Sequence, residues 1–248
     1  MRLRVASFNI RTSRGRDGRN RWQRRRETCI ETIRAFSADI VGLQEVRPDQ
    51  LDDLRKAFLH ATILGAGRDV DGGGEHASVL VAPGEWTVES SETRWLSETP
   101  TRPGSRGWDA GLPRVATLAW LRCGATRVGV ANTHFDHQGP AARERSGELI
   151  ATWLDENRDR PWIVLGDLND VPGSPPLRLL AAAGYTDALP AQAGGTEHSF
   201  SGATDRSRID YILIGPGVRV AAAWIGHERL RGRLPSDHWP VLADLVLD

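Results

Sequence analysis

The sequence has few cysteines, no long apolar run and no excess of either charge. Cys29 and Cys123 are the only cysteines in 248 residues, so a disulfide framework and a cysteine-rich zinc site are excluded. No stretch approaches the roughly 18 apolar residues of a membrane span. Residues 1–10 lack the charged and then apolar pattern of a signal peptide. We therefore expect a cytoplasmic protein without a membrane span.

The balance of charge argues against a protein whose main task is to grip long nucleic acids. Lys and Arg number 32, Asp and Glu number 32, and the formal net charge is zero. Non-specific binding of nucleic acid relies on a basic surface that releases counterions. A nuclease with a local basic patch stays compatible with this composition. Nine tryptophans are many for this length, and we expect some of them to line a groove.

The apolar pattern alternates between helix and strand periods along the chain. Trp22, Cys29, Ile33 and Phe36, for example, recur at helical spacing. Helices are predicted over residues 22–37, 48–59, 140–157 and about 177–183. Strands are predicted over residues 3–10, 39–45, 61–64, 77–82, 86–95, 114–122, 127–134, 162–167, 207–214, 218–226 and 239–246. This order favours an α/β fold with sheets packed together and helices outside. No repeat or linker divides the chain, so we expect a single domain over residues 1–248.

Polar side chains occur where several of these predicted strands begin or end. Four of them stand at carboxyl ends: Asn9, Glu45, His134 and Asp167. Asp210 lies early in another strand, and Asp237 and His238 directly precede the last one. Each has an ordinary alternative as a turn residue or a helix start. Because strands of packed sheets end close together, the combination predicts that these residues meet at one rim.

The chemical types in this set favour a hard cation. Carboxylate and amide oxygens, without a cysteine cluster, suit Mg²⁺ or Mn²⁺. A zinc site is the alternative, because His134 and His137 have His-x-x-His spacing. In a loop at a strand end, however, that spacing need not aim both imidazoles at one point. The sequence therefore predicts a Mg²⁺ or Mn²⁺ site, with one ion or two.

Six ordered segments resemble the motifs of the endonuclease/exonuclease/phosphatase superfamily, which includes deoxyribonuclease I, exonuclease III and neutral sphingomyelinases. They are Ser7-Phe8-Asn9, Leu43-Gln44-Glu45, Asn132-Thr133-His134, Gly166-Asp167-Leu168-Asn169, Arg208-Ile209-Asp210-Tyr211 and Ser236-Asp237-His238. The match runs from residue 3 to about residue 245. The resemblance implies a four-layered α/β sandwich, with two β-sheets face to face and helices on both outer faces.

The resemblance also implies roles at the metal. Glu45 would be the principal metal ligand, assisted by Asn9 and Asp237. Asp167 would orient or deprotonate the attacking water, and Asn169 would donate a hydrogen bond to the phosphoryl oxygen. These parts would supply what phosphoryl transfer needs, namely charge neutralisation and a positioned nucleophile.

Three further residues would act around the phosphate. By the same resemblance, His238 would contact the phosphate as a base or an electrostatic group, and Asp210 would fix its tautomer. Whether Asp167 or His238 takes the proton of the water stays open. The Thr133-His134 pair is similar to the deoxyribonuclease I and sphingomyelinase side of the superfamily, where this histidine is a second phosphate-contacting or acid group.

Three segments are candidates for shaping the substrate pocket. One is a cluster of arginines, Arg14, Arg16, Arg19, Arg21, Arg24, Arg25 and Arg26, which is either a solvated face or a positive rim. Another is the glycine-rich stretch that ends in Glu75 and His76, which lacks the lysine of a nucleotide-binding loop. The third is the long irregular stretch 95–114, where Trp108 and Arg114 are candidates for stacking and for pairing with phosphate.

The predicted function is metal-dependent hydrolysis of a phosphate ester by in-line attack of an activated water. Without a basic surface, a small molecule or a lipid headgroup is favoured as substrate, whether a diester or a monoester. The alternatives are an endo- or exonuclease acting on DNA or RNA, and a non-catalytic binding module on the same scaffold. The sequence makes no prediction about the oligomeric state.

Overall fold

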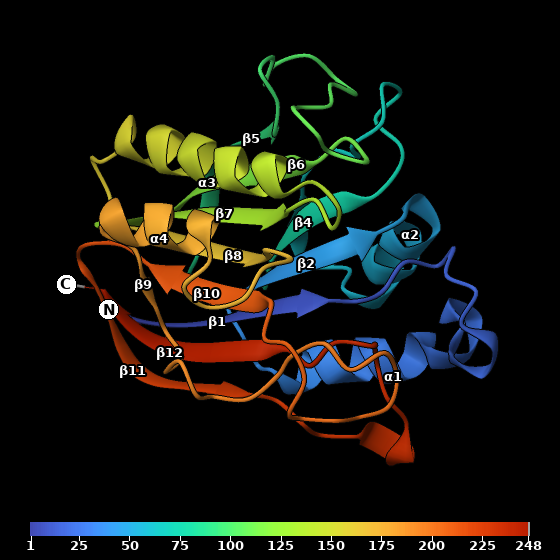
Figure 1. The fold of residues 1–248 in the computed structure, drawn as a ribbon. Coiled ribbons are helices and arrows are strands. Elements are labelled where there is room, and N and C mark those ends of the chain that lie inside the picture. Colours follow the sequence, from blue (N-terminus) through green and yellow to red (C-terminus); the bar gives the residue numbers. More distant parts are fainter. Residues whose placement is uncertain (248) are drawn as a thin grey trace.

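The structure is a computed structural model that describes residues 1–247. Two six-stranded sheets lie face to face (Figure 1). The first sheet has the order β11 (Val218–Ile225), β12 (Val241–Leu247), β1 (Arg2–Asn9), β2 (Ile40–Val46), β4 (His76–Val81), β3 (Thr62–Leu64). The second has the order β5 (Thr87–Trp95), β6 (Val115–Cys123), β7 (Thr126–His134), β8 (Trp162–Asp167), β10 (Asp210–Ile214), β9 (Thr186–Asp187).

Each sheet is mixed, with one parallel pair of strands near its middle. In the first sheet β1 is parallel to β2, and in the second β7 is parallel to β8. The other neighbouring strands are antiparallel. Because both strands of a parallel pair end at the same edge, each sheet places two carboxyl ends side by side.

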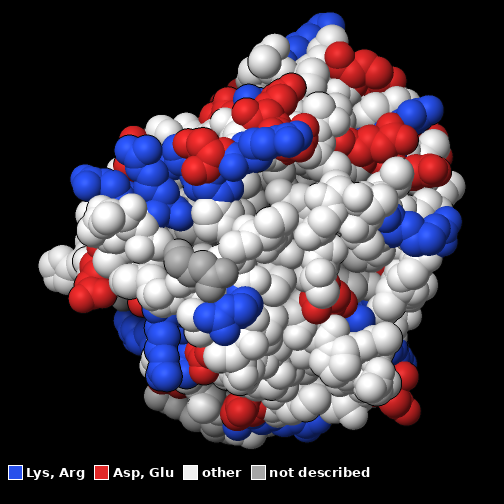
Figure 2. Space-filling view, turned by 90° about the vertical axis from the view of Figure 1, so that its left-hand side faces the viewer, with Lys and Arg blue, Asp and Glu red and all other residues white. Residues whose placement is uncertain are grey.

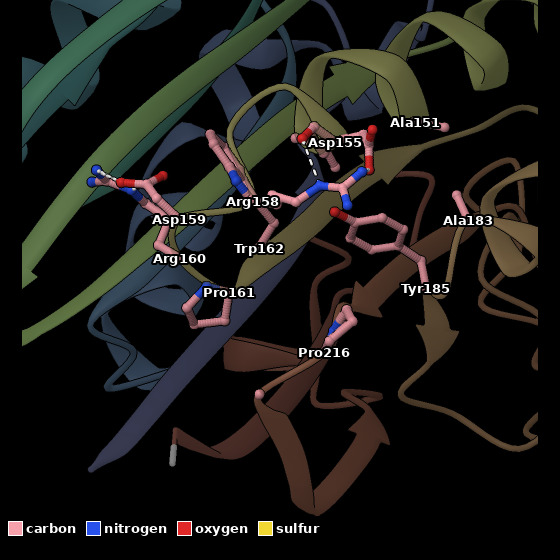
Figure 3. A pocket seen from close by; sticks show the side chains of 12 residues that line it. Ala151, Asp155, Arg158, Asp159, Arg160, Pro161, Trp162, Ala183, Tyr185 and Pro216 are labelled. Carbon is pink, nitrogen blue, oxygen red and sulfur yellow. Dashed lines mark hydrogen bonds and ion pairs between the residues drawn. The ribbon is translucent and has the colours of Figure 1, made fainter.

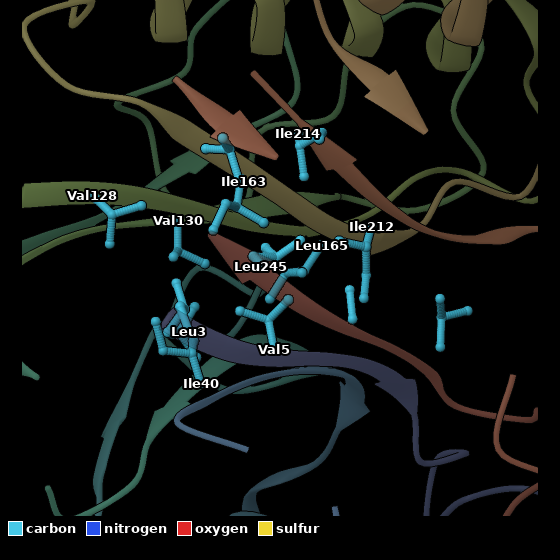
Figure 4. Close-up of a cluster of buried hydrophobic side chains, with 14 of the residues drawn as sticks. Leu3, Val5, Ile40, Val128, Val130, Ile163, Leu165, Ile212, Ile214 and Leu245 are labelled. Carbon is cyan, nitrogen blue, oxygen red and sulfur yellow. The ribbon is translucent and has the colours of Figure 1, made fainter. Parts of the chain in front are cut away.

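The space between the sheets is filled by aliphatic side chains. Val5 and Ile40 of the first sheet belong to one buried cluster with Ile163 and Leu165 of the second (Figure 4). Along a strand every second residue points to the same face, so the alternating apolar residues of each sheet supply one wall of this core. Burial of this apolar surface is the main force that holds the two sheets together.

Two helices cover the outer face of each sheet. The helices α1 (Trp22–Ala35) and α2 (Pro48–Ala57) share a buried cluster with the outer side chains of the first sheet. The helices α3 (Pro140–Asp155) and α4 (Pro175–Ala182) cover the second sheet in the same way. The layers are therefore helices, sheet, sheet and helices, which confirms the predicted four-layered α/β sandwich.

Most elements were predicted within about two residues of their bounds, and the exceptions have local causes. The strand predicted over 207–214 begins at Asp210, because the carbonyl oxygen of Ser207 is instead bonded to Thr196 and Glu197 of a crossing loop. The two residues of β9 and the 3₁₀ helices Gly18–Asn20 and Leu230–Gly232 are too short to leave a periodic pattern. Within residues 1–247 no helix is long and apolar enough to cross a membrane, and the cytoplasmic location stays a prediction.

Candidate active site

Three of the predicted residues lie on neighbouring strands at one end of the second sheet. His134 is the register partner of Asp167 across the parallel pair β7–β8. Asp167 is in turn the register partner of Asp210 across the antiparallel pair β8–β10. Directly paired positions place their side chains on the same face of a sheet. Register alone therefore brings these three polar groups together, although 76 residues separate the first from the last.

The first sheet supplies the other half of the site from the ends of β1 and β2. Asn9 ends β1, and Glu45 lies near the end of β2 beside an irregularity in its pairing with β4. Such irregularities redirect a side chain. The hydroxyl of Ser236 donates to the carbonyl oxygen of Asn9 at 2.7 Å, and this bond brings the following Asp237 and His238 to the same edge.

The side chain of Asn9 lies beneath the cleft and is hydrogen-bonded to one carboxylate from each sheet. Its amide nitrogen donates to Glu45 at 3.0 Å and to Asp167 at 2.9 Å. Its amide oxygen accepts from the backbone N–H of Arg11 at 2.9 Å, and this bond fixes the orientation of the amide group. Because Asn9 is fully buried, it lies under the carboxylates rather than on the surface of the cleft.

His238 and Asp210 form a buried hydrogen-bonded pair. The Nδ1 atom of His238 lies 2.8 Å from Oδ2 of Asp210 and 3.9 Å from Oδ2 of Asp167. Burial favours the neutral imidazole, but the charges of Asp210, Asp167 and Asp237 outweigh it and raise the pKa of His238 well above its usual value. With Nδ1 committed to Asp210, Nε2 is the nitrogen that can meet a substrate in the cleft.

Asp167 has the properties of a proton acceptor near neutral pH. Burial and the charge of Asp210 raise its pKa to about 7, although His238 and the amide of Asn9 stabilise the ionised form. Its Oδ1 atom accepts from the backbone N–H of Asn169 at 3.0 Å. The carboxylate is thus held in a fixed position beside a cationic imidazole.

His134 and Asn169 are hydrogen-bonded to each other on the opposite side of Asp167. The amide nitrogen of Asn169 lies 2.9 Å from Nε2 of His134 and donates to the carbonyl oxygen of Phe135 at 3.0 Å. Burial and the charges of Arg114 and Arg68 lower the pKa of His134 well below its usual value. His134 is therefore neutral here, with Nε2 as the hydrogen-bond acceptor and Nδ1 carrying the proton.

The site holds more buried negative charge than its cationic side chains neutralise, and this fits a cation. Glu45, Asp167 and Asp237 line the cleft, Asp210 is the register partner of Asp167, and Oδ1 of Asp210 is buried without a partner among the described residues. Burial and the charge of Glu45 raise the pKa of Asp237, although His238 and Arg11 oppose the shift. Oxygen-rich donors of this kind match Mg²⁺ or Mn²⁺.

Two groupings of these donors are available to a metal. The atoms of Asp167, Asp210 and His238 lie within 4.8 Å of one another, and Nδ1 of His238 is hydrogen-bonded to Asp210 at 2.8 Å. Glu45 and Asp237 line the cleft on the side of the first sheet, where their carboxylates are free of such a bond to an imidazole. That Glu45 and Asp237 together hold a metal stays a prediction.

The cleft is lined by strained backbone. Seven non-glycine residues in the described part of the chain have a left-handed backbone conformation. Five of these line the cleft, namely Arg11, Glu45, Asn169, Ser199 and Phe200. L-residues rarely adopt this conformation, and surrounding structure must hold it in place. Strain gathered at one cleft supports its assignment as the functional site.

The structure places only two of the four predicted substrate residues in the cleft. Glu75 and Arg114 line it, and Arg114 is held by Asp136 at 3.3 Å and by Nδ1 of His137 at 2.9 Å. His76 is buried instead, with Nδ1 3.0 Å from the carbonyl oxygen of Val46, because it begins β4 and points inward. Trp108 is partly exposed outside the cleft.

None of the described residues that line the cleft is a tryptophan, although Trp162 lines a separate hollow, and none belongs to the arginine cluster of residues 14–26. Arg25 is buried, whereas the other arginines of that cluster are exposed, which supports the solvated face. The alternative zinc pair also lacks support, because Arg114 already holds the Nδ1 atom of His137 and no described metal group contains both histidines.

Several residues of the cleft were not predicted from the sequence. Arg11, Thr12 and Asp17 come from the loop after β1, and a second wall is formed by Glu197, Ser199 and Phe200. Arg11 stands only two residues after Asn9, and Phe200 is an aromatic residue in a polar loop. The positions of Arg11 and Phe200 in the sequence could have indicated a role in the site. Which side of each loop faces the cleft, however, depends on tertiary contacts.

A larger hollow of about 610 Å³ lies at the other end of β8 and has different chemistry (Figure 3). Its charged side chains pair with one another, as Arg158 does with Asp155 and Arg160 with Asp159. The face at this end of the molecule carries both signs of charge in small groups (Figure 2). The cleft at the opposite end, with a volume of about 440 Å³, is lined by His134, His137 and His238 and by the carboxylates of Glu45, Asp167 and Asp237, and it is the candidate active site.

Comparison with known proteins agrees with this geometry. The model of the endonuclease/exonuclease/phosphatase family matches residues 6–238. The family protein of Bacteroides vulgatus is 34% identical with a TM-score of 0.92, and the match covers 100% of both chains. The family protein of Bacteroides thetaiotaomicron is 30% identical with a TM-score of 0.92, over 100% of this chain and 98% of that one.

A third solved structure carries a stated activity. It is a mannosyl-6-phosphatase of Bacteroides thetaiotaomicron, 29% identical with a TM-score of 0.91, and the match covers 99% of this chain and 100% of that one. No curated protein matches the sequence. Members of the family are metal-dependent hydrolases of phosphate esters. The match over residues 6–238, together with the site at the sheet edge, shows that this chain belongs to the endonuclease/exonuclease/phosphatase family.

Proposed function

We propose that the protein hydrolyses a phosphate ester of a small molecule or lipid headgroup, in a reaction that depends on Mg²⁺ or Mn²⁺. The observation that carries this proposal is the buried pair His238–Asp210 beside Asp167, in a cleft of about 440 Å³. That volume lies in the range of sites for small molecules. The similarity to a mannosyl-6-phosphatase favours a monoester of a polyhydroxylated alcohol. Because both sheets supply site residues, we treat residues 1–248 as one catalytic domain.

The metal would be held by Glu45 and Asp237, with Asn9 orienting Glu45 from below. A bound Mg²⁺ or Mn²⁺ would neutralise charge on the non-bridging oxygens of the phosphate. Asn9 supports this role because its amide nitrogen also fixes Asp167 at 2.9 Å. The group Asp167, Asp210 and His238 could accept a second ion, and a count of bound Mn²⁺ ions per chain would decide between one and two.

Asp167 and His238 would handle the proton of the attacking water. Asp167, with a pKa of about 7, is suited to a base at neutral pH. His238 stays cationic beside Asp210, so it is suited to stabilise the negative charge that develops on the phosphate. This division favours Asp167 as the base.

Asn169 and His134 would contact the phosphate and the leaving group. Both amide hydrogens of Asn169 are bonded to His134 and Phe135, so a bond to a phosphoryl oxygen would replace the bond to His134. His134 would then be free to turn its imidazole toward the leaving oxygen. A bound phosphate would also raise the pKa of His134, because a nearby negative charge favours the protonated form.

Two substitutions test the proposal together with a panel of phosphate esters. Glu45→Gln removes a charged metal ligand, and His238→Ala removes the cationic imidazole. We expect each variant to fold and to lose roughly 10²-fold or more in kcat in the presence of Mg²⁺ or Mn²⁺. Variants that fold normally and keep the turnover of the wild type would instead support a non-catalytic binding module.

A nuclease is the alternative function. It is favoured by the range of activities in the family's description and by the exposed Arg16, Arg19 and Arg21 in the loop that follows β1. Plasmid and oligonucleotide assays beside the ester panel separate the two functions. Strong nuclease activity that falls steeply with salt would favour the nuclease, whereas turnover of small esters alone would support our proposal.

A further inference from the structure

Arg11 lies at the edge of the carboxylate cluster with its backbone held in a left-handed conformation. Its φ angle is 56°. Its N–H donates to the side chain of Asn9 at 2.9 Å, and its carbonyl oxygen accepts from Arg25 at 2.6 Å and from Gln50 at 2.9 Å. Three hydrogen bonds thus hold a conformation that an arginine seldom adopts. Arg25 is itself buried and bonded to four carbonyl oxygens, so this support is rigid.

The guanidinium group of Arg11 is held between two carboxylates. Its Nε and Nη2 atoms donate to the two oxygens of Asp17 at 3.1 Å and 3.0 Å. Nε also lies 3.4 Å from Oδ2 of Asp237. The side chain is 31% exposed and lines the cleft. Because the bonds to Asp17 use Nε and Nη2, the Nη1 end of the guanidinium is available to a ligand.

Arg11 and Arg114 are the two arginines among the described residues that line the cleft. Arg114 is bonded to Asp136 and His137 and lines the same pockets as His134, on the side of the second sheet. Arg11 lies on the side of the first sheet, where Glu45 and Asp237 would hold the metal. Of the two arginines, Arg11 is therefore the one placed to contact a phosphate that is also bound to that metal.

We propose that Arg11 is a substrate-binding residue that contacts a non-bridging oxygen of the phosphate, and that it weakens metal binding at Asp237 while the cleft is empty. This inference rests on the proposed function. A guanidinium binds phosphate oxygens through strong charge-assisted hydrogen bonds. The same positive charge repels a divalent cation that approaches Asp237. Asp17 acts as a positioning residue that holds the guanidinium toward the cleft.

The variant Arg11→Gly separates these effects from folding. Glycine keeps the left-handed backbone without strain and removes the guanidinium. The probes are Mn²⁺ alone, and inorganic phosphate added to the Mn²⁺-saturated protein, both measured by calorimetry. We expect Mn²⁺ to bind severalfold more tightly and inorganic phosphate to bind roughly tenfold more weakly. Arg14→Ala removes an exposed arginine outside the cleft and should change neither affinity.

The opposite signs of the two changes distinguish binding of substrate from a structural role. Weaker binding of both probes, with a lower thermal midpoint, would mean that Arg11 only supports the loop and would overturn the inference. Unchanged binding of both probes would also overturn it, while the proposed function would stand. A wild-type protein that binds Mn²⁺ but not phosphate, or neither, would overturn the inference and the proposed function together. Arg11→Lys keeps the charge but not the planar fork, so it should restore phosphate binding only in part.

Discussion

The bond between Asp210 and His238 is the polar contact on which the proposed chemistry most depends. Asp210 is fully buried, and its Oδ2 atom lies 2.8 Å from Nδ1 of the imidazole. A buried carboxylate in this position keeps one tautomer of the imidazole and stabilises its cationic form. An amide in the same place would do neither, although it has nearly the same shape.

Asp210→Asn should therefore lower kcat by roughly 10³-fold with a small effect on KM. The measurement is steady-state kinetics on whichever ester is turned over, together with the pH profile of kcat. The cationic form of His238 should be lost at a lower pH in the variant, because the charge that raises its pKa is absent. Asp205→Asn, at an exposed position in the loop that precedes β10, is the control. A variant with an unchanged kcat would contradict the assigned role.

At the scale of elements, one carboxylate organises the wall of the cleft that follows β7. Asp136 is buried and accepts from the backbone N–H groups of Gly111, Gln138 and Gly139 at 3.1, 2.9 and 2.8 Å. It also accepts from Arg114 at 3.3 Å. Burial opposes its ionisation, but these N–H groups and the arginine hold its pKa well below the usual value.

Asp136→Asn should lower the free energy of unfolding by about 3 kcal/mol at pH 7, because it breaks a buried charged network. A carboxyl group whose pKa is depressed by folding stabilises the protein above its unfolded pKa of about 3.9 and loses this contribution as the pH falls below it. Urea unfolding at several pH values measures the free energy of unfolding of wild type and variant. The difference between the two should thus be largest at pH 7 and should shrink below about pH 4. Glu98→Gln, at an exposed position in a nearby loop, should show no such difference. An equal loss at pH 7 and below pH 4 would contradict this explanation.

At the scale of the whole molecule, the cleft joins two sheets that each bring negative charge to the same edge. Glu45 and Asp237 belong to the side of the first sheet, and Asp167 and Asp210 belong to the second. Repulsion among these carboxylates opposes the packing of the sheets at that edge, and a bound cation would remove it. Metal binding and global stability should therefore be linked.

Mn²⁺ should raise the thermal midpoint of the protein, and a chelator should reverse the rise. At a concentration a hundred times its dissociation constant, a ligand that binds only the folded state raises the free energy of unfolding by about 2.7 kcal/mol. Thermal unfolding with Mn²⁺, Mg²⁺ and EDTA measures the effect. In Glu45→Gln the rise should be much smaller, because one charged ligand is gone. A rise of the same size in this variant would place the metal elsewhere.

The helices and strands were predicted correctly where the residues themselves show a periodic apolar pattern. The apolar runs of β2 and β8 and the helical spacing of α1 and α3 depend on local pattern, which a chain expresses without reference to its partners. Asp167 and Glu45 were likewise visible, because each carboxylate ends an apolar run. Glu75 and His76 show the limit: adjacent residues at the start of a strand face opposite ways, and only the register of β4 decides which one reaches the cleft.

By itself, the sequence determined the layered fold and most of the polar groups at the sheet edge, because strand ends and apolar periods are encoded locally. The tertiary structure decided which loop residues join them. Arg11 faces the cleft because Asn9, Arg25 and Gln50 hold its backbone in a left-handed conformation, and those partners lie up to 39 residues away along the chain. A left-handed conformation costs energy locally, and this cost is offset only by contacts that exist after folding. No local sequence pattern therefore predicts it.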